Sequence, residues 1–185
     1  YYLTAEASIT AVATQALAEV WLDFVGFEIL ALTVDDQPAA QRRIGDKLVV
    51  TLPAPLSQEQ SFTLVILYQG EMTRRPSPYV PFVDHLGLFY TASNTLYALS
   101  EPDGARFWFP CNDHPRDKAL FHFEISVPPG FTAVANGTLV EEYTDDAGTT
   151  FVWEHASPMA PYLATIAVGE YVEVTGTSPD GIPLR

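Results

Sequence analysis

Cysteine is the rarest residue of this chain, with Cys111 alone among 185 residues. A single cysteine excludes an internal disulfide framework. Because it stands between Pro110 and Asn112, we expect a small buried apolar side chain rather than a nucleophile. Basic residues are also few, nine against 23 acidic ones, which gives a net charge of −14. Nucleic acids and anionic membrane surfaces are therefore unfavourable partners, since both require a basic face. No apolar run approaches the roughly 20 residues of a membrane span.

Two further absences concern catalysis. The chain has no H-E-x-x-H segment, in which two histidines one helical turn apart bind zinc. None of its four histidines stands at a ligand spacing; they are His85, His114, His122 and His155. No serine lies in a Gly-x-Ser-x-Gly segment, and the prolines around Cys111 and His114 do not favour a dyad. We expect neither a metal site nor a catalytic residue in this chain.

The pattern that is present is typical of β-structure. Hydrophobic residues make up 48% of the chain, and 15 prolines and 11 glycines interrupt it, which favours many short strands. Alternating or apolar runs predict strands over residues 3–12, 19–24, 27–34, 47–52, 61–68, 121–127, 149–155, 164–168 and 170–174. The expected fold is all-β: an antiparallel β-sandwich or a saddle-shaped pair of sheets, with one short helical turn at residues 115–119.

Two turn signals predict hairpins. Residues 86–90 and 95–98 flank Ser93-Asn94, and residues 132–134 and 139–140 flank Asn136-Gly137. Asn-Gly is the strongest short hairpin signal. Between residues 70 and 87 the sequence is least regular and contains Arg74-Arg75. We interpret this part as a surface loop, with a lid or an interdomain contact as the alternative.

Residues 100–121 combine proline, glycine, paired charges and aromatic side chains. Glu101 and Arg106 flank a Pro-Asp-Gly turn signal, so one tight reversal of the backbone could hold both side chains. The aromatic residues 107–109 would anchor that turn to a core. Asp113, followed by Pro115, is typical of a helix N-cap.

The same stretch carries a resemblance. Residues 101–121 read Glu-Pro-x-Gly-Ala-Arg-x-x-Phe-Pro-Cys-x-Asp-x-Pro-x-x-Lys-Ala-x-Phe, which resembles the signature of the amino-terminal β-domain of aminopeptidase N-type (membrane alanyl aminopeptidase, gluzincin) zinc metallopeptidases. Residues 22–34, 157–163 and 168–171 are similar to other segments of that domain, so the resemblance covers nearly the whole chain. It implies a β-domain over residues 1–176, with its first strand trimmed. Residues 177–185 would then be an exit strand or linker toward a missing catalytic domain.

The resemblance also implies a function. The parent protein would remove amino-terminal residues from peptides, with its zinc cofactor held in the catalytic domain. This chain would be non-catalytic, inactive alone, and would cap the active site against that intramolecular partner. Glu101 would be its substrate-binding residue, reaching the free α-amino group of the peptide. The Glu101-Pro102 bond is expected to be cis, as family members tend to have a strained peptide here.

The residues by themselves also allow other interpretations of Glu101 and of the domain. The carboxylate of Glu101 could form a local salt bridge with Arg106 or Arg116. The domain could belong to a relative that has lost catalysis and acts as a protein-interaction scaffold. A generic adhesion-type β-sandwich is the third interpretation.

Overall fold

The computed structural model describes residues 2–72, 75–77 and 79–184. It confirms the all-β prediction, because the chain is built from antiparallel strands. Within these ranges, the helical parts are two short 3₁₀ turns, η1 (Ala105–Phe107) and η2 (Pro161–Leu163). Within the described ranges, no helix has the length and apolar character needed to cross a membrane.

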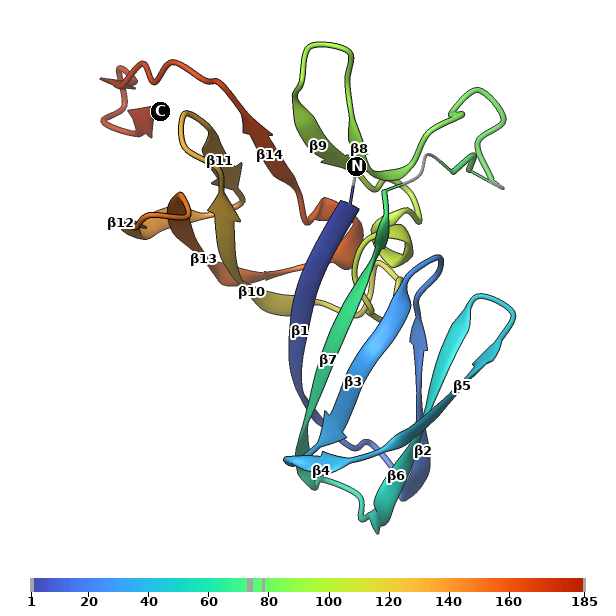
Figure 1. The fold of residues 1–185 in the computed structure, drawn as a ribbon. Coiled ribbons are helices and arrows are strands. Elements are labelled where there is room, and N and C mark those ends of the chain that lie inside the picture. Colours follow the sequence, from blue (N-terminus) through green and yellow to red (C-terminus); the bar gives the residue numbers. More distant parts are fainter. Residues whose placement is uncertain (1, 73–74, 78, 185) are drawn as a thin grey trace.

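The amino-terminal half is a sandwich of two antiparallel sheets (Figure 1). One sheet has the order β1 (Tyr2–Val12), β7 (Ser61–Glu71), β3 (Glu28–Val34), β4 (Gln37–Pro38). The other has the order β2 (Leu17–Asp23), β6 (Lys47–Leu56), β5 (Ala40–Ile44). Alternate side chains of β7 are buried, as expected for a strand with one face on a core. The two sheets enclose one apolar cluster, whose members include Phe24, Leu48, Leu64 and Ile66.

The carboxy-terminal half has a second apolar cluster between two further sheets. Their orders are β10 (Ala119–Val127), β13 (Thr149–Met159), β12 (Thr138–Thr144), and β11 (Thr132–Ala135), β14 (Ile166–Gly169), β9 (Leu96–Leu99), β8 (Gly87–Tyr90). A small hairpin of β15 (Gly176–Thr177) and β16 (Pro183–Leu184) follows. Leu3 and Met72, at the ends of the long β1–β7 pair, pack against this second core. The β1–β7 ribbon therefore joins the two halves (Figure 1).

One of the two predicted hairpins is confirmed and the other is wrong. Strands β8 and β9 pair directly around Ser93-Asn94. By contrast, the strands on either side of Asn136-Gly137 belong to different sheets, since β11 pairs with β14 and β12 pairs with β13. The turn exists, and Gly137 has a φ of 101°, but it moves the chain from one sheet to the other. Pairing with more distant strands decides the topology here, which a two-residue turn signal does not encode.

The predicted helical turn at residues 115–119 is also wrong. His114 and Asp117 close a single turn, with the Asp117 N–H donating to the His114 carbonyl, and β10 begins at Ala119. The Asp113 carboxylate, expected as an N-cap, accepts from Arg106 instead. Ala119 already pairs with Met159 of β13, and the helical turn of this segment lies earlier, at η1. In the loop predicted between residues 70 and 87, Arg74 lies outside the described residues, whereas Arg75 bridges to Leu86.

Candidate functional site

Residues 100–113 lie across the junction of the two halves and are fastened to both. On the amino-terminal side, Asp23 and Cys111 exchange backbone hydrogen bonds of 2.7 and 3.1 Å. The Tyr68 hydroxyl donates to the Trp108 carbonyl oxygen at 2.8 Å. On the carboxy-terminal side, the Trp108 ring packs into the second core, and its Nε1 donates to Ser100 Oγ at 3.0 Å. The segment is therefore held from two directions.

A tight turn at the start of this segment carries Glu101. The Gly104 N–H donates to the Ser100 carbonyl oxygen at 2.6 Å, which closes the turn. The Glu101-Pro102 bond inside it is cis, which confirms that prediction. A side chain at Gly104 would meet Leu86 Cβ at 2.9 Å, so glycine lets the turn pack against the chain beside it.

Glu101 itself is exposed. Its carboxylate makes no hydrogen bond or ion pair with any residue that the structure describes, Arg106 and Arg116 included. The local salt bridge considered as an alternative is thus not formed with either arginine. The turn presents a carboxylate toward solvent from a well-packed base.

The guanidinium of Arg106 lies within 4 Å of the carboxylates of three aspartates. Its Nε lies 3.0 Å from Asp113 Oδ2, while two further nitrogens lie 3.8 Å from Asp23 Oδ1 and 3.9 Å from Asp103 Oδ2. Asp23 also pairs with Lys47 Nζ at 2.7 Å, and its Oδ2 accepts from the backbone N–H of Asp113 at 3.0 Å. Sequence reasoning missed this cluster, because its members come together from β2, β6 and the central segment.

Burial governs the electrostatics of the cluster. It raises the pKa of Asp103 and of Asp113 above the usual range, although the charge of Arg106 opposes the shift in both cases. Asp103 Oδ1 is buried and has no hydrogen-bond partner among the described residues. Burial likewise raises the pKa of the Cys111 thiol, which disfavours the nucleophilic thiolate. Cys111 is buried, as predicted.

We predict that Asp103 makes the stability of the protein pH-dependent. An acid whose pKa is raised in the folded state binds its proton more tightly there than in the unfolded chain, so it destabilises increasingly as pH rises through the interval between the two pKa values. Relative to Asp103→Asn, the native protein should gain stability as pH falls from 7 toward about 4, the ordinary pKa of aspartate.

Urea unfolding of both proteins across this pH range measures the difference. The other acids of the cluster titrate in both proteins and largely cancel. Asp36→Asn, in the exposed β3–β4 turn, is the matched control and should show no such trend. A difference between the native protein and Asp103→Asn that stays constant with pH would contradict the prediction.

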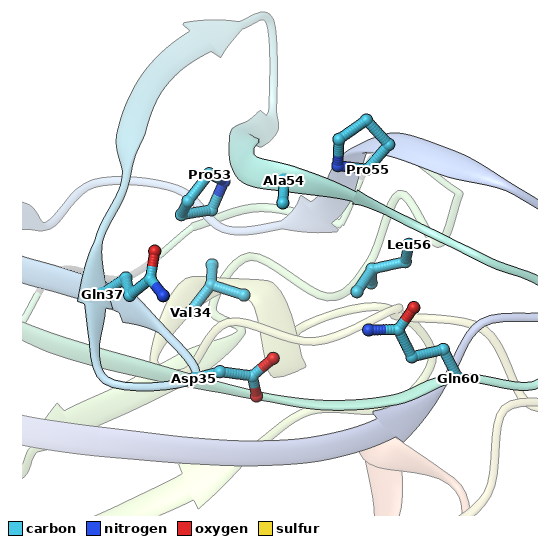
Figure 2. A pocket seen from close by; sticks show the side chains of 8 residues that line it. All are labelled: Val34, Asp35, Gln37, Pro53, Ala54, Pro55, Leu56 and Gln60. Atoms are coloured by element: carbon cyan, nitrogen blue, oxygen red, sulfur yellow. The ribbon is translucent and has the colours of Figure 1, made fainter.

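Other candidate sites lie away from this segment, including a shallow pocket of about 260 Å³ beside the turn at Asp145–Gly148 that no residue of the Glu101 turn lines. The described residues contain no group of three or more histidine, cysteine or acidic side chains placed to hold a metal ion. A small pocket of about 80 Å³ lies between the β3–β4 turn and the end of β6 (Figure 2). Its Asp35 carboxylate already accepts from the Thr63 N–H, and no residue of the Glu101 turn lines it. One oxygen of the acidic side chain that lines this pocket is therefore already engaged within the domain.

The match to known proteins agrees with this geometry. Residues 1–163 match the family model described as the peptidase M1 N-terminal domain. The chain belongs to this family. The matched range includes residues 100–113, which carry the Glu101 turn, and the strands of both sheets of the amino-terminal sandwich. The match confirms the resemblance seen in the sequence.

The relatives that this M1 N-terminal domain matches are longer proteins. It is 39% identical to pig (Sus scrofa) glutamyl aminopeptidase over 85 residues, which is 45% of this chain and 9% of the relative. It is 22% identical to a leucyl aminopeptidase of Saccharolobus solfataricus over 169 residues, which is 82% of this chain and 20% of the relative. A solved mutant of an M1 zinc metallopeptidase from Deinococcus radiodurans, bound to a Tyr-Ser-Ala substrate, superposes with a TM-score of 0.82 at 30% identity. That match covers 91% of this chain and 38% of the solved one, so the chain spans only a minor part of these relatives.

Proposed function

We propose that this M1 N-terminal domain is part of a zinc-dependent aminopeptidase, caps its active site, and offers Glu101 to the α-amino group of the peptide substrate. The observation that carries the proposal is the exposed Glu101 carboxylate, which stands without a partner among the described residues on a turn fastened to both halves. Several relatives are named aminopeptidases, which supports the removal of amino-terminal residues as the reaction.

The domain contributes positioning rather than chemistry. A peptide amino terminus is a cation, and a carboxylate held in a partly desolvated cleft pairs with it through charge-assisted hydrogen bonds. Fixing the amine aligns the first peptide bond, which supplies part of the entropy of alignment. An excess of 14 negative charges favours the approach of a cationic terminus over an anionic one.

Zinc has no ligand set among the described residues, so this part of the chain does not fit the metal. In our proposal the ion is held by a catalytic domain that residues 177–185 lead toward, and residues 1–176 form the cap. The isolated chain would then bind no zinc and hydrolyse no peptide.

Replacement of Glu101 by glutamine in the parent protein tests the proposal. The change keeps the shape of the side chain and removes its charge, so it removes a charge-assisted interaction of about 1.5–3 kcal/mol with the ammonium. We expect kcat/KM for peptides with a free amino terminus to fall by roughly 10- to 100-fold, mostly through KM. Steady-state kinetics on aminoacyl substrates measure it.

Glu6→Gln is the matched control, because Glu6 is exposed on β1 and lies in another part of the domain. If Glu101→Gln changed neither KM nor kcat, the role of Glu101 would be abandoned. A parent protein that hydrolyses no peptide and holds no zinc would instead favour the interaction scaffold.

A further inference from the structure

A carboxylate that binds an amine must point in one direction. No neighbouring side chain among the described residues contacts the carboxylate of Glu101 to orient it. The backbone of the turn therefore sets the point and the Cα–Cβ direction from which the side chain extends. That turn is closed by the hydrogen bond from Gly104 to Ser100, and Trp108 Nε1 holds its first residue through Ser100 Oγ. The residues that follow the turn supply a further attachment, to the amino-terminal sandwich.

Arg106 is placed to do this. Three different nitrogens of its guanidinium face three carboxylates from three stretches of chain: Asp103 in the turn, Asp113 after it, and Asp23 at the end of β2. The Arg106 side chain is only 16% exposed. Its backbone is tied as well, because the Val25 N–H donates to the Arg106 carbonyl oxygen at 2.9 Å. One side chain thus connects the Glu101 turn to the amino-terminal sandwich.

The charge balance leaves Glu101 available. Asp23, Asp103 and Asp113 all face Arg106. The one further cation of the cluster is Lys47, which pairs with Asp23. The three buried acids already outnumber these two cations. Arg106 is therefore occupied within the domain and does not neutralise the carboxylate two residues before Asp103.

We propose that Arg106 is a positioning residue for Glu101: its guanidinium, held by Asp23, Asp103 and Asp113, fixes the direction in which the turn presents Glu101 to the substrate amine. The inference rests on the proposed function of Glu101. A planar fork meets separate carboxylates with separate nitrogens, which the compact ammonium of lysine does not reproduce. Arg106→Lys therefore keeps the charge and loses the geometry.

The test uses the parent protein with Arg106→Lys, Glu101→Gln and the double variant. Arg106→Lys should raise KM for free-amino peptides about tenfold, since a misplaced binding group loses much of its effect, and change kcat by no more than about twofold. In the Glu101→Gln background the same substitution should add nothing further to KM. Arg42→Lys is the matched control, because it loosens the exposed Arg42–Glu19 pair on the same sandwich and should leave KM unchanged.

The possible results separate the two ideas. An unchanged KM in Glu101→Gln removes the proposed function and this inference with it. A raised KM in Glu101→Gln, together with an Arg106→Lys effect that multiplies it in the double variant, overturns only the positioning role.

A second variant keeps the inference testable should Arg106→Lys fail to fold. Asp103→Asn removes one arm of the cluster and leaves Arg106 in place. It should raise KM when Glu101 is intact and add nothing when it is combined with Glu101→Gln. An equal rise in KM in both backgrounds would overturn the positioning role.

Discussion

Replacing Trp108 with alanine is expected to lower the free energy of unfolding by about 3–5 kcal/mol, the range for truncating a large aromatic side chain in a core. Trp108 is 6% exposed and packs within the carboxy-terminal core. Its ring lies edge-on to Phe109, with centroids 4.6 Å apart, and its Nε1 bonds Ser100 beside the Glu101 turn. The truncation opens a cavity and leaves the Ser100 hydroxyl without its indole donor. Denaturant unfolding measures the loss.

An exposed tryptophan and a smaller change provide the comparison. Trp21→Ala is the matched control, because Trp21 is 48% exposed on β2 and should cost no more than about 1 kcal/mol. Trp108→Phe keeps much of the apolar volume and should fall between the two. If Trp108→Ala were no more costly than Trp21→Ala, the central segment would not depend on this anchor.

Most strands of this domain could be predicted because their signal is local, although residues 170–174, predicted as a strand, form none. Residues 121–127 of β10 alternate apolar and polar side chains, and the exposure of these side chains in the strand alternates with the same period. The β8–β9 hairpin joins strands that are neighbours both in the chain and in space. The aromatic anchor at residues 107–109 was also correctly predicted, since Trp108 lies in the core.

What could not be predicted depends on partners distant in sequence. Asp113 had a plausible local role as a helix cap, but Arg106 and the end of β2 take its carboxylate and its N–H. Asp113 and Asp23 are 90 positions apart, and no periodicity relates them. Asp103 and Asp113 are near Arg106 in sequence, as Glu101 is, and only the folded path of the segment shows that the two aspartates, together with Asp23, are its partners. Candidate residues were visible in the sequence, whereas their pairing was not.

Gly137→Ala should lower the free energy of unfolding by roughly 3–5 kcal/mol, more than a glycine in a simple hairpin would. Part of the cost is the positive φ of 101°, which an L side chain adopts at about 1–2 kcal/mol. The rest is steric. A Cβ at this position would overlap the carbonyl oxygen of Glu154 and come within 2.8 Å of the His155 nitrogen, both backbone atoms of β13. Backbone in a paired strand yields only if the β12–β13 ladder shifts.

A comparison with Gly130→Ala separates the steric part of this loss from the conformational part. Gly130 has a φ of 87°, and a Cβ there would meet nothing within 4 Å, so its cost should be the conformational part alone, about 1–2 kcal/mol. Denaturant unfolding of the two variants under the same conditions gives the difference directly. Equal losses would mean that Gly137 serves only the turn, as the Asn-Gly signal suggests. The larger loss at Gly137 would show that glycine is required there because the chain passes against β13 as it crosses from one sheet to the other.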